Sequence, residues 1–271
     1  MLVIQSGITL PAAEAALPSG TPLILWDTDV EYSNVTATSE ETSYPASNLG
    51  NPATTLEWRA TSTAIQYLTV PPSGTVDAVG LARHNFGTAG IAVSVEVDSG
   101  GGYSQIIPPF TPTNDDPILM HFTGAAYTGV RVKLAVGSIA ARLAVYYAGK
   151  MLRLERGYDV GADFTPPEFA RKTDSINGMS HRGDYLGRII TSQFLSDAAF
   201  DFRHFTPSWY RTYFDPFIEA AQTERPFFFA WSPTDYPNEV TFAWLMEDPM
   251  PRTSPVTGRV NVTLKMGGIL A

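Results

Sequence analysis

The first 155 residues alternate apolar and polar positions in short runs, and Gly, Pro, Ser, Asp and Asn separate the runs. A period of two places successive side chains on opposite faces of a strand. The clearest runs, 91–98 and 129–136, carry Val, Ile or Leu at every second position, so we expect both to face a common core. Regularly spaced short strands predict a β-sandwich or a barrel, with strands over 65–70, 79–82, 91–98, 129–136 and 142–147.

The last third of the chain changes pattern. Residues 189–195 and 200–203 alternate on either side of a short segment, which predicts a β-hairpin. The aromatic run 227–231 predicts a strand that is buried on both faces, and 240–244 predicts the strand after it. Residues 259–266 alternate again, which predicts a last half-buried strand.

A helix is predicted over 207–222. Thr206 offers a side-chain oxygen to the free amides of a first turn, and Pro207 has the fixed φ that suits the first helical position. Trp209, Tyr213 and Phe217 recur at helical spacing, followed by Ala220 or Ala221, so we expect them to form one apolar face. Pro216 is expected to kink the helix.

These elements predict a mainly β protein with an N-terminal β-sandwich and a C-terminal β-barrel-like α+β domain that holds one helix. Two segments rich in Pro, Gly or Ala do not fit either domain and are interpreted as arms, with an extended entry strand as the alternative for residues 1–25. The expected parts are an N-terminal arm over 1–29, the sandwich over 30–155, a connecting arm over 156–185 and the second domain over 186–271.

Composition excludes several classes of function. The formal charge is −9 and no cluster of Lys and Arg occurs, which argues against nucleic acid. No run is apolar for the roughly 18 residues that a membrane span needs, and no basic segment precedes an apolar one at the start, so we expect neither membrane insertion nor export. Cysteine is absent, which removes disulfides and thiolate chemistry.

Catalytic motifs are missing from the sequence. The histidines have no metal-binding helical spacing, and no nucleophile elbow or phosphate-binding loop occurs. The loop of Asn114, Asp115 and Asp116 has oxygen ligands that suit calcium, but Asx-rich turns cap their own backbone in the same way, which is the preferred interpretation. We expect no enzyme activity, no cofactor and no metal.

One cluster in the first domain resembles a known fold. The run Tyr-Pro-Ala-Ser-Asn-Leu at 44–49, the pair Trp58-Arg59, the strand from Val79 and the pair His84-Asn85 resemble the galactose-binding-like or discoidin-type jelly roll over about residues 30–150. The resemblance implies that a ring beside an arginine could stack on a sugar, with Trp58, Arg59, His84 and Asn85 as the candidates. The alternative is structural, with Trp58 as a core residue and the other side chains capping local backbone.

The second domain carries a further resemblance. Its order of Leu-Gly-Arg, a strand, Phe-Thr-Pro-x-Trp-Tyr, Arg-Pro-Phe-Phe and Trp-x-Pro, after a Tyr-x-Gly-Lys strand at 147–150, resembles tail proteins of long-tailed bacteriophages and prophages. This implies a structural protein of the tail tip, made in the host cytoplasm and located in the virion. The implied partners are copies of itself in a ring, the tail tube, the tape measure and the tail-tip hub.

Assembly is therefore the main functional hypothesis, and recognition of a host-surface glycan by the jelly roll is the alternative. The connecting arm is too long and too rich in Gly and Pro for a compact link. Its apolar residues would be exposed in a monomer, and a neighbouring subunit in a closed ring could cover them. The candidate assembly residues are Tyr158, Phe164, Phe169, Ile176 and Met179.

Overall fold

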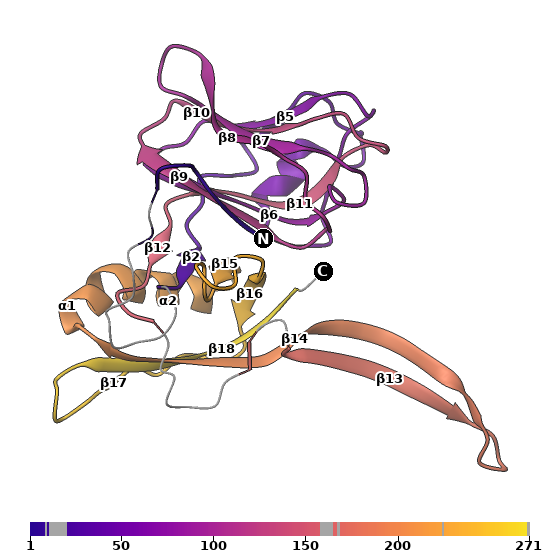
Figure 1. The fold of residues 1–271 in the computed structure, drawn as a ribbon, viewed down its shortest axis with the longest axis vertical. Helices are drawn as coiled ribbons and strands as arrows, with labels where there is room; N and C mark the ends of the chain where they lie inside the picture. The colour runs from indigo at the N-terminus through magenta and orange to yellow at the C-terminus, as the bar shows by residue number, and fades with distance from the viewer. Residues whose placement is uncertain (9, 11–20, 158–164, 167–168, 224, 270–271) are drawn as a thin grey trace.

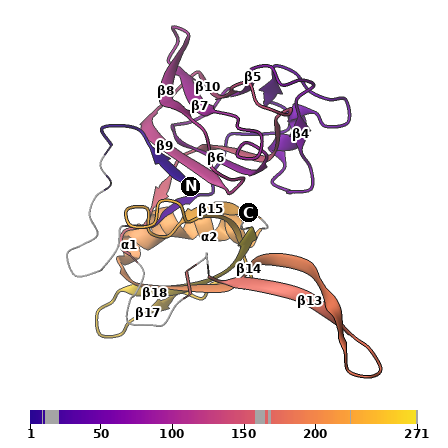
Figure 2. The ribbon, with the colours of Figure 1, turned by 45° about the vertical axis from the view of Figure 1, so that its right-hand side comes forward.

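The computed structural model describes residues 1–8, 10, 21–157, 165–166, 169–223 and 225–269. A β-sandwich lies on a second, curled sheet that holds a helix, and a two-stranded hairpin projects from this second sheet (Figure 1). The same stacking is visible after a turn of 45° (Figure 2). The predicted fold class, a mainly β protein with a sandwich and a second β-rich unit, is confirmed.

Two five-stranded sheets form the sandwich, in the orders β1-β9-β6-β11-β4 and β3-β5-β10-β7-β8. The pairing of β1 with β9 is parallel, and the other pairings of the sandwich strands are antiparallel. The strands are β1 (Leu2–Ile4), β3 (Thr36–Ala37), β4 (Trp58–Arg59), β5 (Gln66–Val70), β6 (Val76–His84), β7 (Val93–Asp98), β8 (Tyr103–Phe110), β9 (Ile118–Ala125), β10 (Gly129–Leu134) and β11 (Arg142–Gly149).

The two runs expected to share a core are neighbouring strands of one sheet. Val97 of β7 lies opposite Val130 of β10, and Val95 lies opposite Val132. These valines are buried in the core between the two sheets. The prolines of β8 lie in an edge strand at a register shift in its pairing with β7, and both features tolerate a missing N–H.

The second sheet has the order β12-β2-β15-β16-β18-β14-β13, and β17 pairs with β18. Its strand β15 is buried along its whole length, as predicted for the aromatic run. Phe227 and Phe229 pack on the helix side, whereas Phe228 and Ala230 face the sandwich. The strands are β2 (Leu23–Leu25), β12 (Leu152–Arg153), β13 (Arg171–Met179), β14 (Tyr185–Phe205), β15 (Phe227–Ala230), β16 (Val240–Leu245), β17 (Arg252–Thr253) and β18 (Val260–Ile269).

The start of the chain joins both units instead of forming one arm. Strand β1 pairs with β9 of the sandwich, while β2 pairs with β12 and β15 of the second sheet. All three residues of β2 are fully buried, because its side chains alternate between two cores. The described residues of the expected N-terminal arm therefore contribute strands, and residues 9 and 11–20 of that arm lie outside the described part.

The expected hairpin over 189–203 is wrong in the position of its turn. Strand β14 runs unbroken for 21 residues and pairs along its first part with β13, which lies in the segment expected to be a connecting arm. The turn lies at 180–184, where Gly183 has a positive φ. Residues 189–203 contain no Gly or Pro, so the backbone has no strong signal to reverse there.

The helix boundaries agree with the prediction, but the face of the helix that is buried differs from the predicted one. Segments α1 (Pro207–Trp209), η2 (Tyr210–Phe214) and α2 (Asp215–Gln222) come directly after one another, and η2 is a π turn. A π turn contains an extra residue and rotates the rest of the helix about its axis. Consequently Phe214 is fully buried and Tyr213 is exposed, opposite to the expected face. The π turn immediately precedes Pro216, whose missing N–H interrupts the α-helical ladder.

Side chains outside the helix fix its first turn. The Thr206 hydroxyl accepts a hydrogen bond from the Trp209 amide at 3.4 Å, which confirms the predicted cap. The Glu155 carboxylate accepts from both the Thr206 amide, at 2.7 Å, and the Thr206 hydroxyl, at 2.9 Å. A carboxylate at this end also suits the partial positive charge of a helix N-terminus. The segment directly after β12 therefore positions the start of the helix.

A third core joins the two units. It contains Ala78, Leu119 and Tyr147 from the sandwich and Phe228 and Phe242 from the second sheet. The Tyr147 ring meets Phe228 and Phe242 edge-on, with ring centroids 5.5 and 6.0 Å apart, and its hydroxyl donates to the Pro226 carbonyl at 2.9 Å. Burial raises the pKa of Tyr147, so the hydroxyl stays protonated as this donor.

The helix phase can be tested with two neighbouring aromatic residues. Phe214→Ala empties a fully buried site, so we expect it to lower the free energy of unfolding by about 3–5 kcal/mol. Tyr213→Ala removes an exposed ring, and we expect a change within about 0.5 kcal/mol. Denaturant unfolding of both variants measures the difference. A larger loss of stability in Tyr213→Ala than in Phe214→Ala would show that the helix is continuously α-helical, without the π turn.

The contact between the units depends on a glycine. A Cβ atom at Gly80 would lie 2.5 Å from the buried Phe228 ring, so Gly80→Ala should destabilise the protein by about 1–3 kcal/mol through overpacking. Gly74→Ala is the control, since a Cβ there has no atom within 4 Å. Thermal unfolding of both variants gives the comparison. Equal melting temperatures would mean that the two units do not pack this closely.

Candidate functional site

Two surfaces contain the residues that the sequence suggests for function: the end of the sandwich near β4 and β6, and the projecting hairpin. On the sandwich, Trp58 is fully buried in the core. Its Nε1 donates a hydrogen bond to the Ser39 carbonyl at 2.9 Å. The ring therefore has no free face on which a sugar could stack.

His84 and Asn85 are also buried and hydrogen-bonded within the protein. The Asn85 side chain donates to the Ala140 carbonyl at 2.9 Å and accepts from the Arg142 amide at 3.0 Å. His84 Nδ1 accepts from the Phe86 amide at 3.2 Å, so Nε2 carries the proton and donates to the Asp116 carbonyl at 3.0 Å. Both polar side chains are thus used to hold neighbouring loops, and neither offers a free donor to a ligand.

Arg59 is the most accessible of the four candidates. Its Nε donates to Glu57 Oε1 at 2.7 Å, and its guanidinium carbon lies 3.7 Å from the centroid of the Tyr44 ring. The hydrogen bond to Glu57 raises the pKa of Arg59. The short helix η1 (Ala46–Gly50) contacts β4, and the Asn48 side-chain Nδ2 donates to the Glu57 backbone carbonyl at 2.9 Å. The motif that suggested a sugar site therefore also builds the local structure.

The acidic loop after β8 caps backbone groups. The Asp115 carboxylate accepts from the Thr88 amide at 3.0 Å and from the Thr88 hydroxyl at 2.6 Å. Asn114 donates to Asp116 within the loop. In the part of the chain that the structure describes, no three His, Asp or Glu side chains come together in a way that could hold a metal ion. No described helix is long and apolar enough to cross a membrane.

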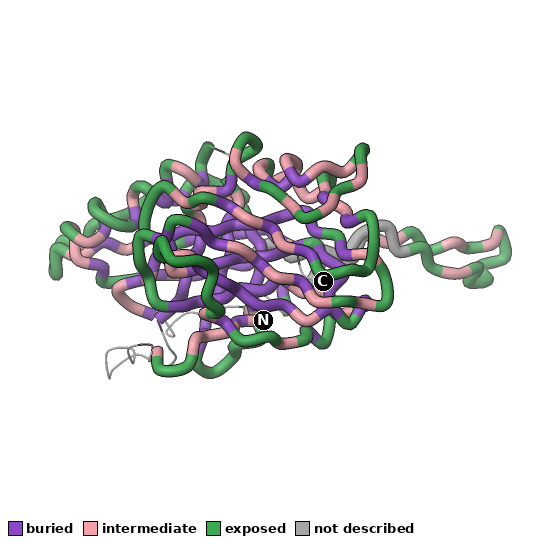
Figure 3. The backbone as a smooth tube through the Cα atoms, turned by 90° about the horizontal axis from the view of Figure 1, so that it is seen from above, coloured by how far each residue is buried: buried purple, intermediate pink, exposed green. Residues whose placement is uncertain are grey.

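The projecting hairpin exposes the second set of candidates. Phe169 precedes β13, while Ile176 and Met179 lie on it, and all three side chains are exposed. Tyr158 and Phe164 lie outside the described residues. Seen from above, the described tip of the hairpin is exposed or intermediate and extends beyond the body of the protein (Figure 3).

Sequence reasoning missed the apolar residues of the second hairpin strand. Tyr185, Leu186 and Ile189 of β14 are exposed, and Ile189 lies directly opposite Ile176. Residues 189–195 were predicted to form one strand of a hairpin, whereas β14 begins at Tyr185 and continues past the sheet that would have covered these side chains. The available signal was the absence of Gly and Pro between 189 and 203, which leaves no strong turn inside the predicted hairpin.

Strand β13 lies at the edge of its sheet, so one side of its backbone has no strand partner among the described residues. Gly178 and Gly187 face each other across the hairpin, and no atom lies within 3 Å of a Cβ built at either position. At Gly187 no atom lies within 4 Å of such a Cβ, and a glycine in a strand allows close approach of another backbone. An open edge with apolar side chains is a suitable surface for pairing with another chain.

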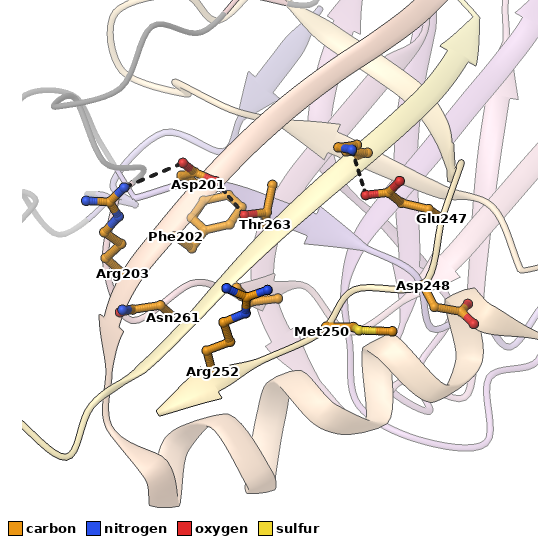
Figure 4. A pocket seen from close by; sticks show the side chains of 11 residues that line it. Asp201, Phe202, Arg203, Glu247, Asp248, Met250, Arg252, Asn261 and Thr263 are labelled. Atoms are coloured by element: carbon orange, nitrogen blue, oxygen red, sulfur yellow. Dashed lines mark hydrogen bonds and ion pairs between the residues drawn. The ribbon is translucent and has the colours of Figure 1, made fainter. Parts of the chain in front are cut away.

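A groove of about 730 Å³ lies on the β14, β17 and β18 strands (Figure 4). Arg203 Nη2 lies 3.7 Å from Asp201 Oδ2, and Lys265 Nζ lies 2.9 Å from Glu247 Oε1. With Asp248 and Arg252 the lining has equal numbers of acidic and basic side chains. These pairs largely neutralise one another, and the exposed Met250 gives the groove a small apolar area.

Comparisons with known proteins concern less than half of the chain. Neither a protein-family model nor a curated protein matches it. Among solved structures, chitosan-binding module 1 of a chitosanase/glucanase from Paenibacillus sp. IK-5 is 19% identical, covering 46% of this chain and 99% of that one, with a TM-score of 0.41. A family 32 carbohydrate-binding module of C. perfringens NanJ, in complex with galactose, is 18% identical and covers 45% and 97%, with a TM-score of 0.37.

The buried histidine gives the sandwich a pH dependence. Burial lowers the pKa of His84 to about 4, although Asp115 nearby acts in the opposite direction. The unfolded chain takes up this proton near pH 6.5, whereas the folded protein does so only near pH 4. Stability is therefore unaffected above about pH 6.5 and falls as the pH drops from about 6.5 to about 4, by about 3 kcal/mol in total.

Urea unfolding of the wild-type protein and of His84→Gln at several pH values measures this effect. We expect the variant to lose a slope of up to about 1.4 kcal/mol per pH unit between about pH 6.5 and pH 4. His181→Gln, at an exposed position in the hairpin turn, is the control and should retain the slope. If the free energy of unfolding changed with pH in the same way for the wild type and for His84→Gln, His84 would not be buried in its neutral form.

Proposed function

We propose that this protein is a structural subunit that joins copies of itself through the β13–β14 hairpin. The observation that carries this proposal is the apolar surface of the hairpin. Ile176, Met179, Tyr185, Leu186 and Ile189 each expose between 62% and 68% of their surface. Covering one such side chain fully contributes about 1.5–3 kcal/mol, and the five lie on one projecting element.

The partner is a second copy of the chain, and charge supports this choice. Residues 171–190 contain four Arg or Lys and two Asp, a net charge of +2. Subtracting them from the whole chain leaves 14 basic and 25 acidic residues, a net charge of −11. A basic hairpin is therefore attracted to the acidic body of another copy, and such complementarity favours association and sets its orientation.

A hairpin that reaches from one copy to a different surface of the next makes a head-to-tail contact. Contacts of this kind close into a ring when the rotation between neighbours divides a full turn. The resemblance of residues 30–270 to tail proteins supports placing this ring at the tail tip of a long-tailed bacteriophage. Its neighbours there are the tail tube, the tape measure and the tail-tip hub.

A second candidate function is recognition of a host glycan by the sandwich. Its specific support is an open cavity beside Arg59 and Glu57, at the same end of the sandwich as the predicted sugar-binding residues. Because Trp58, His84 and Asn85 are buried, recognition in this cavity depends on other side chains. The hairpin and the cavity involve different residues, so one chain can perform both functions.

Self-association is tested by light scattering over a wide range of protein concentrations. The wild type should show a mass that rises to a multiple of the monomer, because association covers the hairpin. The triple variant Ile176→Thr, Leu186→Thr, Ile189→Thr should weaken association at least tenfold. Its melting temperature should change little, since all three side chains are exposed.

Val256→Thr is the matched control, because Val256 is 90% exposed and lies outside the hairpin. It should associate as the wild type does. A wild type that remains monomeric at every concentration, or a triple variant that associates normally, would contradict the proposal. Antibody labelling of virions, read by electron microscopy, tests the tail-tip location separately.

A further inference from the structure

A cavity of about 270 Å³ opens on the outer surface of the sandwich, where β4, β6 and β11 lie side by side. It is smaller than most ligand pockets, so it holds one small group instead of an extended chain. Most of its lining is polar. The residues around it are Thr54, Glu57, Arg83, His84, Arg142 and Ala144.

Arg83 has an unusual backbone conformation for this position. Its φ is +56°, in the left-handed region, although it lies inside the nine-residue strand β6. Left-handed conformations are uncommon for residues other than glycine, and they are concentrated at functional sites. The side chain of Arg83 is exposed, while both neighbours in the strand are buried. The strained conformation therefore belongs to one of the two arginines that line the cavity.

Arg142 adds a second positive charge that is not neutralised. It lies directly opposite Arg59 in the β4–β11 pairing, and like charges at such positions repel. Glu57 binds Arg59, so the single carboxylate among the lining residues is already used. Neither Arg83 nor Arg142 makes an ion pair with any residue that the structure describes. The cavity consequently has an excess of positive charge in a chain whose net charge is −9.

We propose that this cavity binds the carboxylate of an acidic sugar residue. Arginine presents paired N–H donors that match the two oxygens of a carboxylate. A singly charged carboxylate fits better than phosphate, because Glu57 would repel a doubly charged group. The Thr54 hydroxyl can bond a sugar hydroxyl beside the anion, and so can Glu57 Oε2, because Arg59 contacts only the other carboxylate oxygen, Oε1. His84 contributes a neutral wall, since both ring nitrogens already have partners within the protein.

This inference rests on the second candidate function, glycan recognition, and is independent of self-association. It replaces the buried Trp58 and Asn85 with Arg83 and Arg142 as the residues that select the ligand. The selectivity comes from charge, so a neutral sugar that offers the same hydroxyls should bind more weakly. Binding should also weaken as salt rises, because both arginines are exposed.

Titration calorimetry of the full chain with galacturonate, galactose and inorganic phosphate tests the proposal. We expect galacturonate to bind at least tenfold more tightly than either of the other two probes. Arg142→Gln should reduce galacturonate affinity at least tenfold. Arg83→Gly should also reduce it, and should raise the melting temperature, because glycine adopts a positive φ without strain. Arg252→Gln, on the second sheet, is the control and should leave binding unchanged.

Each other outcome has a defined meaning. Phosphate that binds as tightly as galacturonate would reveal a general anion site and overturn the proposal. If galactose binds as tightly as galacturonate and Arg142→Gln changes neither affinity, the proposal is overturned. Glycan recognition would then take place elsewhere on the sandwich. Absence of binding by all three probes would overturn both this proposal and the small-sugar form of glycan recognition.

Discussion

The fold depends on strands that are buried on both faces. In β2 and β15, alternate side chains enter the helix-containing core and the core between the two units. Phe228 fills the space above Gly80, and its neighbours Phe227 and Phe229 pack with the helix side. A strand that supplies two cores cannot move relative to one without disturbing the other. The sandwich and the second unit are therefore joined by a shared core, although the sequence suggested two domains joined by arms.

The same sheet explains why the hairpin is exposed. Strand β14 pairs with β18 at Phe200 and Phe202, where its side chains are covered by the core. Towards its start it extends beyond the helix and keeps only β13 as a partner, as Figure 1 shows. An isolated two-stranded hairpin is marginally stable in water. The alternation of apolar residues thus continues into a region where the protein itself supplies nothing to cover them.

The sequence was sufficient to predict the features that depend on local patterns. The capped helix at Thr206 and Pro207, the sandwich strands and the doubly buried aromatic strand can all be predicted from spacing and side-chain type. The helix phase was not predictable in the same way, because the π turn before Pro216 moves the buried position from Tyr213 to Phe214. The turn at 180–184 was missed because the irregular composition around Gly178 and Gly183 suggested a loop instead of a strand pair.

The candidate sites show a further limit of sequence reasoning. A Trp-Arg pair can face a ligand or the core, and only the pairing of β4 with β11 shows that Trp58 points inward while Arg59 lies opposite Arg142. That register brings Arg59 and Arg142, which are far apart in the sequence, side by side and concentrates positive charge there. The positive φ of Arg83 has no signal in the sequence either, because arginine rarely adopts it.

The shared core of the two units has a consequence for how the proposed functions would combine. A ring assembled through the hairpin would hold every sandwich in the same orientation, so the cavities of all copies would face the same way. A cavity of this size binds one small group and is expected to bind it weakly. Several weak sites held at fixed spacing on one assembly bind a surface with many copies of the ligand far more tightly than one site does. Weak recognition by each copy and strong attachment by the assembly are therefore compatible, provided that the core around Tyr147 and Phe228 keeps the two units fixed.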